Sequence, residues 1–365
     1  MYMKNNNQPI QYQFFSVSRD AWDAMYEEIK KAQKSIYWET YIFIDDEAGQ
    51  RFVDLLEQKA KKGLDIKMVI DGVGSFKLSS LSIDRLKKAG VDLVIYNPVT
   101  LGKFMRFWRA FWERTHRKIM IIDNQIGFIG GVNVRNYMAD WLDLLLMVKG
   151  PIVRSLTRAF AKSYIKSGGD RKKVKKLLHP KLEKSKKLKF LFQFPHAKRS
   201  RIHASFLKSI NKAKKNLKLA VPYYLPNRRL VKALARARKR GVKIDLIIPM
   251  RTDLKVVQWA ARKYYNAMHK LGVKMYFTPK MMHGKAYVVD SKEGMVGSSN
   301  IDKGSFYRNL EANAYFTDKQ MVGDLEKIFK QWKDYSEPFE ESRWKNKGLV
   351  QRLKSAFAEI LSPWL

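Results

Sequence analysis

Two short stretches, separated by nearly half the chain, carry the same reactive side chains at the same spacing. Residues 116–133 read HRKIMIIDNQIGFIGGVN, and residues 283–300 read HGKAYVVDSKEGMVGSSN. Both contain H-x-K-x4-D, then six residues, then G-[GS]-x-N, and the copies are offset by 167 positions. Histidine can act as nucleophile or acid–base group, and lysine can stabilise negative charge. The repeat therefore predicts one site assembled from two half-sites.

The two His–Lys pairs have the composition expected for transfer at a phosphodiester. One of His116 and His283 would attack phosphorus, while the other protonates the leaving oxygen and later deprotonates the acceptor. Lys118 and Lys285 would stabilise the non-bridging oxygens, a role that Mg²⁺ often takes. The sequence shows no carboxylate cluster beside the motifs, so we expect neither a metal ion nor another cofactor.

The ends of the two motifs are expected to bind the same phosphate. Asparagine amides can donate hydrogen bonds to it, and small residues allow the backbone to approach closely. The predicted phosphate-binding residues are Gly131, Asn133, Ser298 and Asn300.

Asp123 and Asp290 complete the motifs and are counted with the catalytic candidates, although strand geometry separates them from the imidazoles. Side chains alternate along a strand. In the strand predicted from His116 to Asp123, the aspartate lies an odd number of positions from the histidine, and the second copy has the same parity. Without a bulge the two side chains face opposite ways. We therefore predict that these aspartates brace the hairpins.

A catalytic imidazole needs an acceptor on its second nitrogen, and one carboxylate follows each motif at a suitable place. Asp143 lies 27 positions after His116, and Glu311 lies 28 positions after His283. Each is expected on the strand that follows its motif hairpin. We predict that these two carboxylates orient the histidines.

The flanks of the motifs also repeat and predict the elements that position them. Residues 58–71 (QKAKKGLDIKMVID) resemble residues 236–249 (RARKRGVKIDLIIP), and residues 86–98 resemble residues 268–279. Each copy reads as a basic helix end, a glycine that can cap it, and an alternating strand. The pattern predicts a duplicated α/β fold. The expected parts are a first half at 1–165, a basic linker at 166–189, a second half at 190–340, and an amphipathic C-terminal helix at 341–365.

These stretches resemble the phospholipase D superfamily, and most closely its bacterial cardiolipin synthases, over nearly the whole chain. The resemblance is carried by residues 41–56, 115–134, 221–249 and 281–313. It implies an α/β/α sandwich with a pseudo-two-fold axis and an active site between the halves. It also implies a phosphatidyl-histidine intermediate, most often on the N-terminal histidine, and an acidic partner for each histidine.

Two departures from the family pattern accompany the resemblance. Long bacterial members begin with two membrane-spanning helices, which this chain lacks, so we expect a short form. The first copy also has Leu142 between Trp141 and Asp143, where the family usually has arginine.

The charge of the chain points to a polyanionic partner. Lys and Arg number 72 against 34 Asp and Glu, a net charge of +38, which suits nucleic acid or an anionic membrane. The absence of cysteine excludes disulfides and thiolate metal sites. Apolar stretches such as 142–148 fall far short of the ~20 residues of a spanning helix. We expect a peripheral protein on the cytoplasmic face of the bacterial inner membrane.

Two aromatic amphipathic segments, at 101–114 and at the C-terminus, are predicted to contact that membrane, although either could pack inside the protein instead. The predicted contact residues are Phe104, Phe107, Trp108, Phe111, Trp112 and Trp364.

The function that the resemblance implies is cardiolipin synthesis, in which one phosphatidylglycerol gives its phosphatidyl group to another and glycerol leaves. The same chemistry with water or another alcohol as acceptor would make a phospholipase D or a different phospholipid. A nuclease also suits the charge, but the aromatic residues follow helical patterns instead of the scattered stacking platforms of nucleic-acid channels. A basic binding module without catalysis would leave both motifs unexplained. We expect no nucleotide cofactor, because no G-x4-G-K-[ST] loop occurs.

Overall fold

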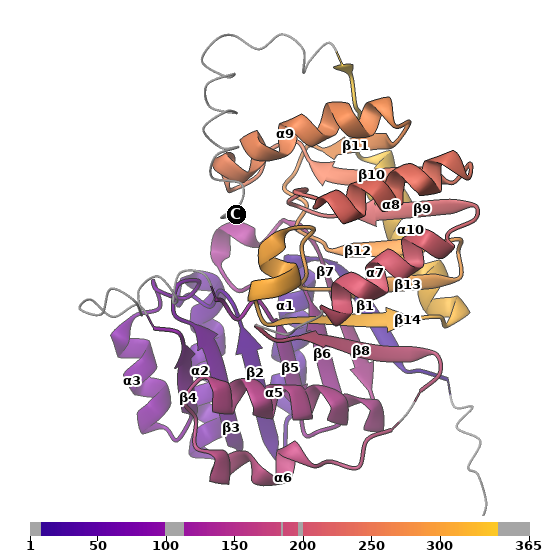
Figure 1. Cartoon of the computed structure of the whole chain (residues 1–365). Helices are drawn as coiled ribbons and strands as arrows, with labels where there is room; N and C mark the ends of the chain where they lie inside the picture. Colours follow the sequence, from indigo (N-terminus) through magenta and orange to yellow (C-terminus); the bar gives the residue numbers. More distant parts are fainter. Residues whose placement is uncertain (1–8, 99–112, 184, 196–199, 342–365) are drawn as a thin grey trace, which may run out of the picture.

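Two α/β halves make up the part of the chain that the computed structural model describes, which comprises residues 9–98, 113–183, 185–195 and 200–341. Each half is built on one mixed β-sheet with helices packed against it. Figure 1 shows the first half in indigo to magenta and the second half in pink to yellow.

The first sheet has seven strands in the order β1-β7-β6-β5-β2-β3-β4. The strands are β1 (Tyr12–Val17), β2 (Ser35–Thr40), β3 (Asp65–Asp71), β4 (Asp92–Tyr96), β5 (Ile119–Ile122), β6 (Ile126–Gly130) and β7 (Leu142–Lys149). Its helices are α1 (Ser18–Lys31), α2 (Glu47–Lys61), α3 (Ser80–Lys88) and α5 (Arg154–Lys166), with short turns η1 (Asn136–Met138) and η2 (Pro151–Val153).

The second sheet has eight strands in the order β15-β11-β10-β9-β12-β13-β14-β8. The strands are β8 (Leu188–Gln193), β9 (Asn216–Ala220), β10 (Lys243–Pro249), β11 (Lys274–Thr278), β12 (Ala286–Val289), β13 (Glu293–Gly297), β14 (Glu311–Phe316) and β15 (Glu337–Pro338). Its helices are α7 (Arg201–Lys212), α8 (Arg228–Lys239), α9 (Lys255–Lys270) and α10 (Lys319–Asp334), with the turn η4 (Gly304–Arg308).

The two sheets repeat one topology, which confirms the predicted duplication. Read from β1 and from β8, the strands follow the same order, and β15 is added at the far edge of the second sheet. In each half three strands run parallel, and the motif hairpin pairs antiparallel with the first of them. Helices begin at matching places, since Asp46 caps α2 and Asn227 caps α8 with their side chains.

Each motif forms a hairpin whose tight turn lies in the left-handed region. Asp123 and Asn124 have φ of 52° and 54°, and Asp290 and Ser291 have φ of 53° and 54°. Turns with two such residues match the twist of antiparallel strands and favour Asp and Asn. The hairpins are thus specified locally by their turn residues.

The strand predicted from His116 to Asp123 is shorter than expected, since β5 begins at Ile119. The residues before it turn toward the other half instead. Thr115 forms an isolated bridge with Leu310, and Leu142 forms one with Met282. The two histidines therefore stand where the halves meet.

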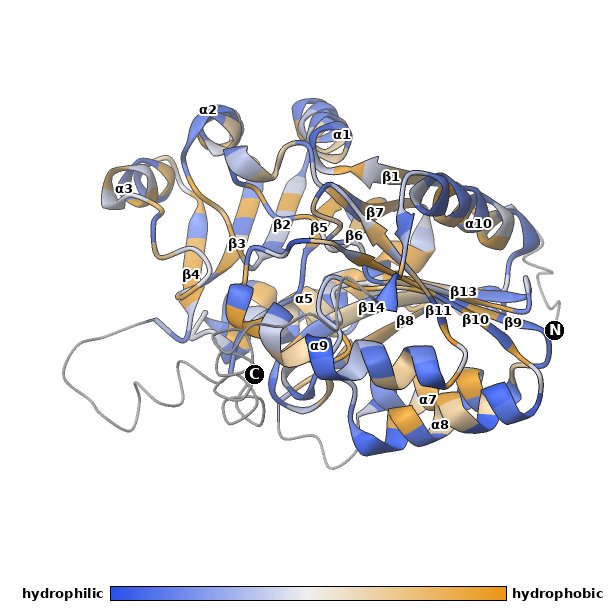
Figure 2. Cartoon of the chain, turned by 90° about the horizontal axis from the view of Figure 1, so that it is seen from above, coloured by the Kyte–Doolittle hydropathy of each residue, from blue (hydrophilic) through white to orange (hydrophobic). Residues whose placement is uncertain are grey.

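The halves share a buried core as well as these bridges. Leu146 of β7 and Phe316 of β14 belong to one cluster of buried apolar side chains, which also includes Phe160 of α5. Figure 2 shows apolar strands in the interior and hydrophilic outer faces on helices such as α7 and α8. Burial of this shared surface fixes the halves relative to each other.

The segment expected as a basic linker, 166–189, packs on the protein. It contains η3 (Arg171–Val174) and α6 (Lys175–Leu178), and Val174 and Leu178 join the shared core. Lys173 pairs with Asp92 at 2.9 Å. The apolar residues between the lysines explain why this stretch lies against the first half.

In the described ranges, no helix combines the length and apolar character needed to span a bilayer. The residues predicted to contact the membrane, Phe104, Phe107, Trp108, Phe111, Trp112 and Trp364, lie outside those ranges, as does all but the first residue of the predicted C-terminal helix.

Candidate active site

His116 and His283 line one cavity between the two halves, with a volume of about 440 Å³. Each is held by a backbone bond to the opposite half: the His116 N–H donates to Leu310 O at 3.0 Å, and the His283 N–H donates to Leu142 O at 2.6 Å. Both side chains are buried. The structure therefore brings the two motif histidines to a common site.

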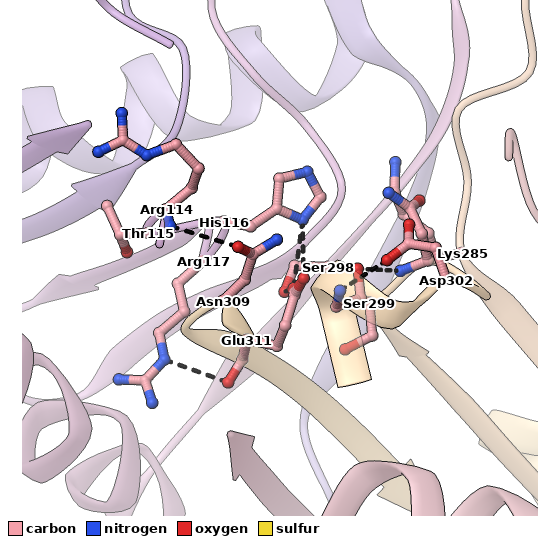
Figure 3. A network of polar contacts seen from close by, with 12 residues as sticks. Arg114, Thr115, His116, Arg117, Lys285, Ser298, Ser299, Asp302, Asn309 and Glu311 are labelled. Atoms are coloured by element: carbon pink, nitrogen blue, oxygen red, sulfur yellow. Dashed lines mark hydrogen bonds and ion pairs between the residues drawn. The ribbon is translucent and has the colours of Figure 1, made fainter. Parts of the chain in front are cut away.

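Each imidazole contacts a carboxylate of the other half. His116 Nδ1 lies 3.1 and 3.2 Å from the two oxygens of Glu311, a contact drawn in Figure 3. His283 Nδ1 lies 2.7 Å from Asp143 Oδ2. A carboxylate at Nδ1 holds the proton there and leaves Nε2 as the reactive nitrogen. We refer to this arrangement as the crossed pairing.

Burial governs the protonation of all four groups. It lowers the pKa of His116 to about 4, with the Lys118 charge as the next cause, and it lowers the pKa of His283 in the same way with Lys285 next. The pKa values of Asp143 and Glu311 stay below their usual values, because the facing histidines and their hydrogen bonds outweigh burial. At neutral pH the site holds neutral imidazoles against ionised carboxylates.

Lys118 and Lys285 are buried beside their histidines. Their ammonium groups donate to His116 O at 2.8 Å and to His283 O at 2.6 Å. Burial, and next the charge of Lys285, lowers the pKa of Lys118 well below its usual value, and burial lowers the pKa of Lys285 to about 8. Neither lysine is among the residues that line the cavity, but a buried ammonium group can stabilise a nearby anion.

The predicted phosphate-binding residues divide into two groups. Asn133 and Asn300 line the cavity, and their binding of a phosphate stays a prediction. Gly131 and Ser298 instead support the carboxylates. A Cβ on Gly131 would lie 2.2 Å from Asp143 Oδ1, so only glycine leaves room for that carboxylate. The Ser298 hydroxyl donates to Glu311 (Figure 3).

Asp123 and Asp290, counted with the catalytic candidates, hold backbone in place on the far side of each hairpin. Asp123 accepts hydrogen bonds from the N–H groups of residues 33–35, and Asp290 accepts them from residues 214–216, all at 2.7–2.9 Å. Their left-handed turn directs them to the segment before β2 or β9. These contacts agree with the bracing role, and a catalytic role for the two aspartates stays a prediction.

Aromatic rings that the sequence analysis did not select surround the imidazoles. The ring of Tyr41 lies 5.1 Å from that of His116, and the rings of Trp141 and Tyr223 lie 5.5 and 6.2 Å from that of His283. All three line the cavity, where aromatic rings reduce the polar surface beside the histidines. Their positions just after β2 and β9, and just before β7, are the signal that could have identified them.

Arg117 is a fully buried cation that links the halves behind the site. It donates to Glu311 O at 3.1 Å, a contact drawn in Figure 3. It also donates to Gln193 O at 2.9 Å and to the Ser163 hydroxyl at 2.7 Å. The second motif has Gly284 at this position, where a Cβ would lie 2.4 Å from the Trp332 ring. In the first half the motif residue Arg117 fills this space, whereas in the second half the helix residue Trp332 fills it.

Within the described residues, no three His, Asp or Glu side chains are grouped closely enough to hold a metal ion.

Arg114 also lines the cavity and lies 3.3 Å from Asp71, whose pKa burial raises to about 6.

Comparisons with known proteins agree on one family. The family model described as "Cardiolipin synthase, PLD-like domain" matches residues 25–164 and 206–333. The cardiolipin synthase of Geobacillus thermodenitrificans is 32% identical over 361 residues, which cover 95% of this chain and 70% of that protein. The "Probable cardiolipin synthase YwiE" of Bacillus subtilis is 30% identical, with coverage of 93% and 69%.

A solved structure supports the fold. The phosphatidylserine synthase of Haemophilus influenzae matches with a TM-score of 0.74 at 15% sequence identity, covering 97% of this chain and 96% of that one. Because the identity is low, this likeness bears on the duplicated α/β architecture alone.

Proposed function

Because this chain belongs to the cardiolipin synthase family of phospholipase D-like enzymes, we propose that it moves a phosphatidyl group from one phosphatidylglycerol to another and releases glycerol. The observation that carries the proposal is the crossed pairing, which places two oriented imidazoles on one cavity. Family membership makes the chain a phosphatidyltransferase, while the donor, the acceptor and the intermediate are our proposal.

In the first step, Nε2 of His116 attacks phosphorus. A P–N bond forms, the P–O bond to glycerol breaks, and His283 gives its proton to the departing oxygen. The lowered pKa of His116 supports its role as nucleophile, because the lone pair on Nε2 is available at neutral pH. His283 must enter protonated, and a bound phosphodiester anion would raise its pKa again by its charge.

In the second step, His283 takes the proton from a hydroxyl of the second phosphatidylglycerol. The new oxygen bonds to phosphorus as the P–N bond breaks, which restores both histidines. Lys118 and Lys285 would stabilise the charge on the phosphoryl oxygens in both steps, with Asn133 and Asn300 as hydrogen-bond donors. One phosphodiester replaces another, so the reaction needs no nucleotide.

The test is turnover of phosphatidylglycerol by the purified chain in the presence of a chelator, with the lipids separated by thin-layer chromatography. We expect cardiolipin and glycerol in equal amounts. Phosphatidic acid as the main product would replace the transferase with a hydrolase, and cleavage of oligonucleotides without lipid turnover would replace both with a nuclease.

Trapping identifies the nucleophile separately. The labelled substrate is a radiolabelled phosphatidyl donor with a leaving group that departs without protonation. The His283→Ala variant should retain label on the protein, because it can still form the P–N bond. The His116→Ala variant should retain none. The reverse result would assign the nucleophile to His283.

We also infer that the protein works at the membrane surface as a peripheral protein on the cytoplasmic face. A net charge of +38 supports this placement, because anionic lipids attract basic surfaces.

A further inference from the structure

Three of the exposed large apolar side chains in the described residues line the active-site cavity, and a fourth neighbours a lining residue in the sequence. Those exposed are Phe76, Leu81, Tyr137, Leu182, Leu254, Tyr307 and Tyr335. Phe76, Tyr137 and Leu254 line the cavity itself, and Tyr307 is adjacent to Arg308, which also lines it. Single exposed apolar residues are ordinary, but a group at a substrate opening marks an interaction surface.

The four side chains form two pairs that the duplication relates. Phe76 lies in the loop after β3 and Leu254 in the loop after the equivalent strand β10, with exposed fractions of 69% and 50%. Tyr137 lies in η1 after the first motif and Tyr307 in η4 after the second, with exposed fractions of 51% and 38%. Figure 1 labels α3 and α9, which begin just beyond the first pair of loops.

This equivalence is informative because the loops otherwise differ in sequence between the halves. The lysine after Phe76 and Leu254 recurs, as Lys77 and Lys255, while the other direct neighbours of the four side chains differ, yet each half exposes an apolar side chain at both places. We call Phe76, Tyr137, Leu254 and Tyr307 the rim. Its members come from four separate loops on both sides of the cavity, so they can all meet one broad partner.

Basic residues accompany the rim. Lys77 lies over the Phe76 ring at 5.7 Å, and Arg135 lies over the Tyr137 ring at 4.5 Å. The further basic residues of these loops are Arg251, Lys255, Lys303 and Arg308. Aromatic or aliphatic side chains flanked by cations are typical of surfaces that enter the headgroup region of an anionic bilayer.

The carboxylates in the same loops have partners within the protein. Asp253 accepts a hydrogen bond from the Tyr223 hydroxyl at 2.5 Å, and Asp140 pairs with Arg19 at 3.4 Å. Asp302 accepts the Ser305 N–H at 2.6 Å. With six basic residues against these three carboxylates, the four loops carry a net positive charge that complements anionic lipid, although Asp46 and Glu47 of the neighbouring helix also contact Asn136.

We propose that the rim docks on an anionic phospholipid bilayer, with Phe76 and Leu254 inserted among the headgroups on opposite sides of the cavity. This inference rests on the proposed function for the nature of the substrate. Docked in this way, the opening faces the membrane surface. A lipid phosphodiester can then reach the histidines while its acyl chains stay in the bilayer.

Site-directed labelling tests this directly, because the full chain contains no cysteine. Phe76→Cys and Leu254→Cys each receive a nitroxide label, with Leu182→Cys and Tyr335→Cys as controls at exposed apolar sites that do not line the cavity. Each labelled protein is bound to vesicles of phosphatidylglycerol and phosphatidylcholine. Collision with oxygen and with a water-soluble nickel chelate then measures the depth of the label. The first two labels should gain oxygen contact and lose nickel contact on vesicles, while the controls should not change.

A second measurement avoids the label. The double variant Phe76→Ser with Leu254→Ser should partition into the same vesicles about tenfold or more weakly, since it loses two apolar anchors, whereas Leu182→Ser with Tyr335→Ser should partition like the unaltered chain. The docking proposal is overturned if both rim labels stay in water on bound protein, if only one is immersed, or if the controls are immersed equally. It is also overturned if the protein binds oligonucleotides but no vesicles.

Turnover is measured separately, on phosphatidylglycerol in detergent micelles. Immersed labels with no cardiolipin formed would support docking and reject the proposed reaction. Cardiolipin formed with both labels in water would support the reaction and reject docking.

Discussion

Glu311 and Asp143 fix which nitrogen of each imidazole faces the cavity. Each carboxylate reaches the histidine of the opposite half, at 3.1 Å for Glu311 and 2.7 Å for Asp143. Ser298 and Gly131 stand at equivalent motif positions and support these carboxylates, one with a hydroxyl and the other by leaving space. The orientation of each histidine therefore depends on the correct docking of both halves.

Replacing either carboxylate by its amide should reduce kcat far more than KM. Glu311→Gln and Asp143→Asn keep the shape but remove the charge and allow the wrong imidazole tautomer, so we expect kcat to fall about 10²- to 10⁴-fold. Steady-state kinetics with phosphatidylglycerol measures the change. If Glu311 acts through the nucleophile His116, adding Glu311→Gln to the His283→Ala variant should lower the radiolabel retained in the trapping assay. A loss confined to KM would contradict the orienting role.

The buried charge of Lys285 lowers the stability of the folded chain. Burial lowers its pKa from 10.5 to about 8, so below pH 8 the folded chain holds a charge in a dry interior. Between pH 8 and about 10.5 the unfolded chain binds the extra proton, so the stability of the unaltered chain rises with pH across this window.

We expect Lys285→Met to abolish turnover while it stabilises the fold by about 1–2 kcal/mol below pH 8, after allowance for the lost hydrogen bond to His283 O. This gain should shrink as the pH approaches 10. Urea unfolding of both proteins at pH 7 and pH 10 checks the prediction. A variant that is less stable at pH 7, or a gain that grows with pH, would show that the buried charge carries no cost.

At the scale of helices and strands, the sequence predicted the motif hairpins more accurately than the segments that precede them. The parity of His116 and Asp123 predicted that the aspartate faces away, and the left-handed turn at Asp123 completes that separation. The late start of the strand, at Ile119 instead of His116, could not be predicted, because the preceding residues are held by the bridge between Thr115 and Leu310 in the other half. Local patterns specify a hairpin, whereas contacts distant in sequence set where it ends.

Gly284 takes the place that Arg117 has in the first motif, and Trp332 fills the space beside it. A larger residue at position 284 should therefore lower the stability of the fold. Gly284→Ala would place a methyl group 2.4 Å from the ring of Trp332, so we expect a loss of about 1–3 kcal/mol in the free energy of unfolding. The second change Trp332→Leu should restore part of it in the double variant.

The matched control is Gly323→Ala on α10, where an added Cβ meets nothing within 4 Å. Alanine favours helix over glycine, so this variant should be as stable as the unaltered chain or about 0.5–1 kcal/mol more stable. Chemical denaturation of the three variants gives the comparison. An unchanged Gly284→Ala protein would show that the core beside the motif can relax.

At the scale of the whole molecule, the repeat in the sequence predicted the duplicated fold and the meeting of the two histidines, but not the crossed pairing. Spacing relates Asp143 to His116 and Glu311 to His283, because it counts along one half at a time. The pairing is decided at the interface, where the backbone oxygens of Leu142 and Leu310, beside Asp143 and Glu311, accept the N–H groups of the opposite histidines. Such a contact leaves no trace in the order of residues, whereas the repeated motif does.

The net charge of +38 belongs to the whole molecule and makes membrane binding depend on salt. Each basic residue near an anionic leaflet contributes roughly 1 kcal/mol, and raising the ionic strength from 0.1 to 1 M shortens the Debye length from ~10 to ~3 Å. We therefore expect co-sedimentation with phosphatidylglycerol vesicles to weaken at least about tenfold over that range, while the weaker binding to pure phosphatidylcholine should not depend on salt. Because apolar insertion of the rim is not screened by salt, a residual affinity should remain at 1 M in the unaltered chain and disappear in the Phe76→Ser, Leu254→Ser variant. Binding that is independent of salt would reject the electrostatic contribution, whereas complete release of the unaltered chain at 1 M would reject the apolar one.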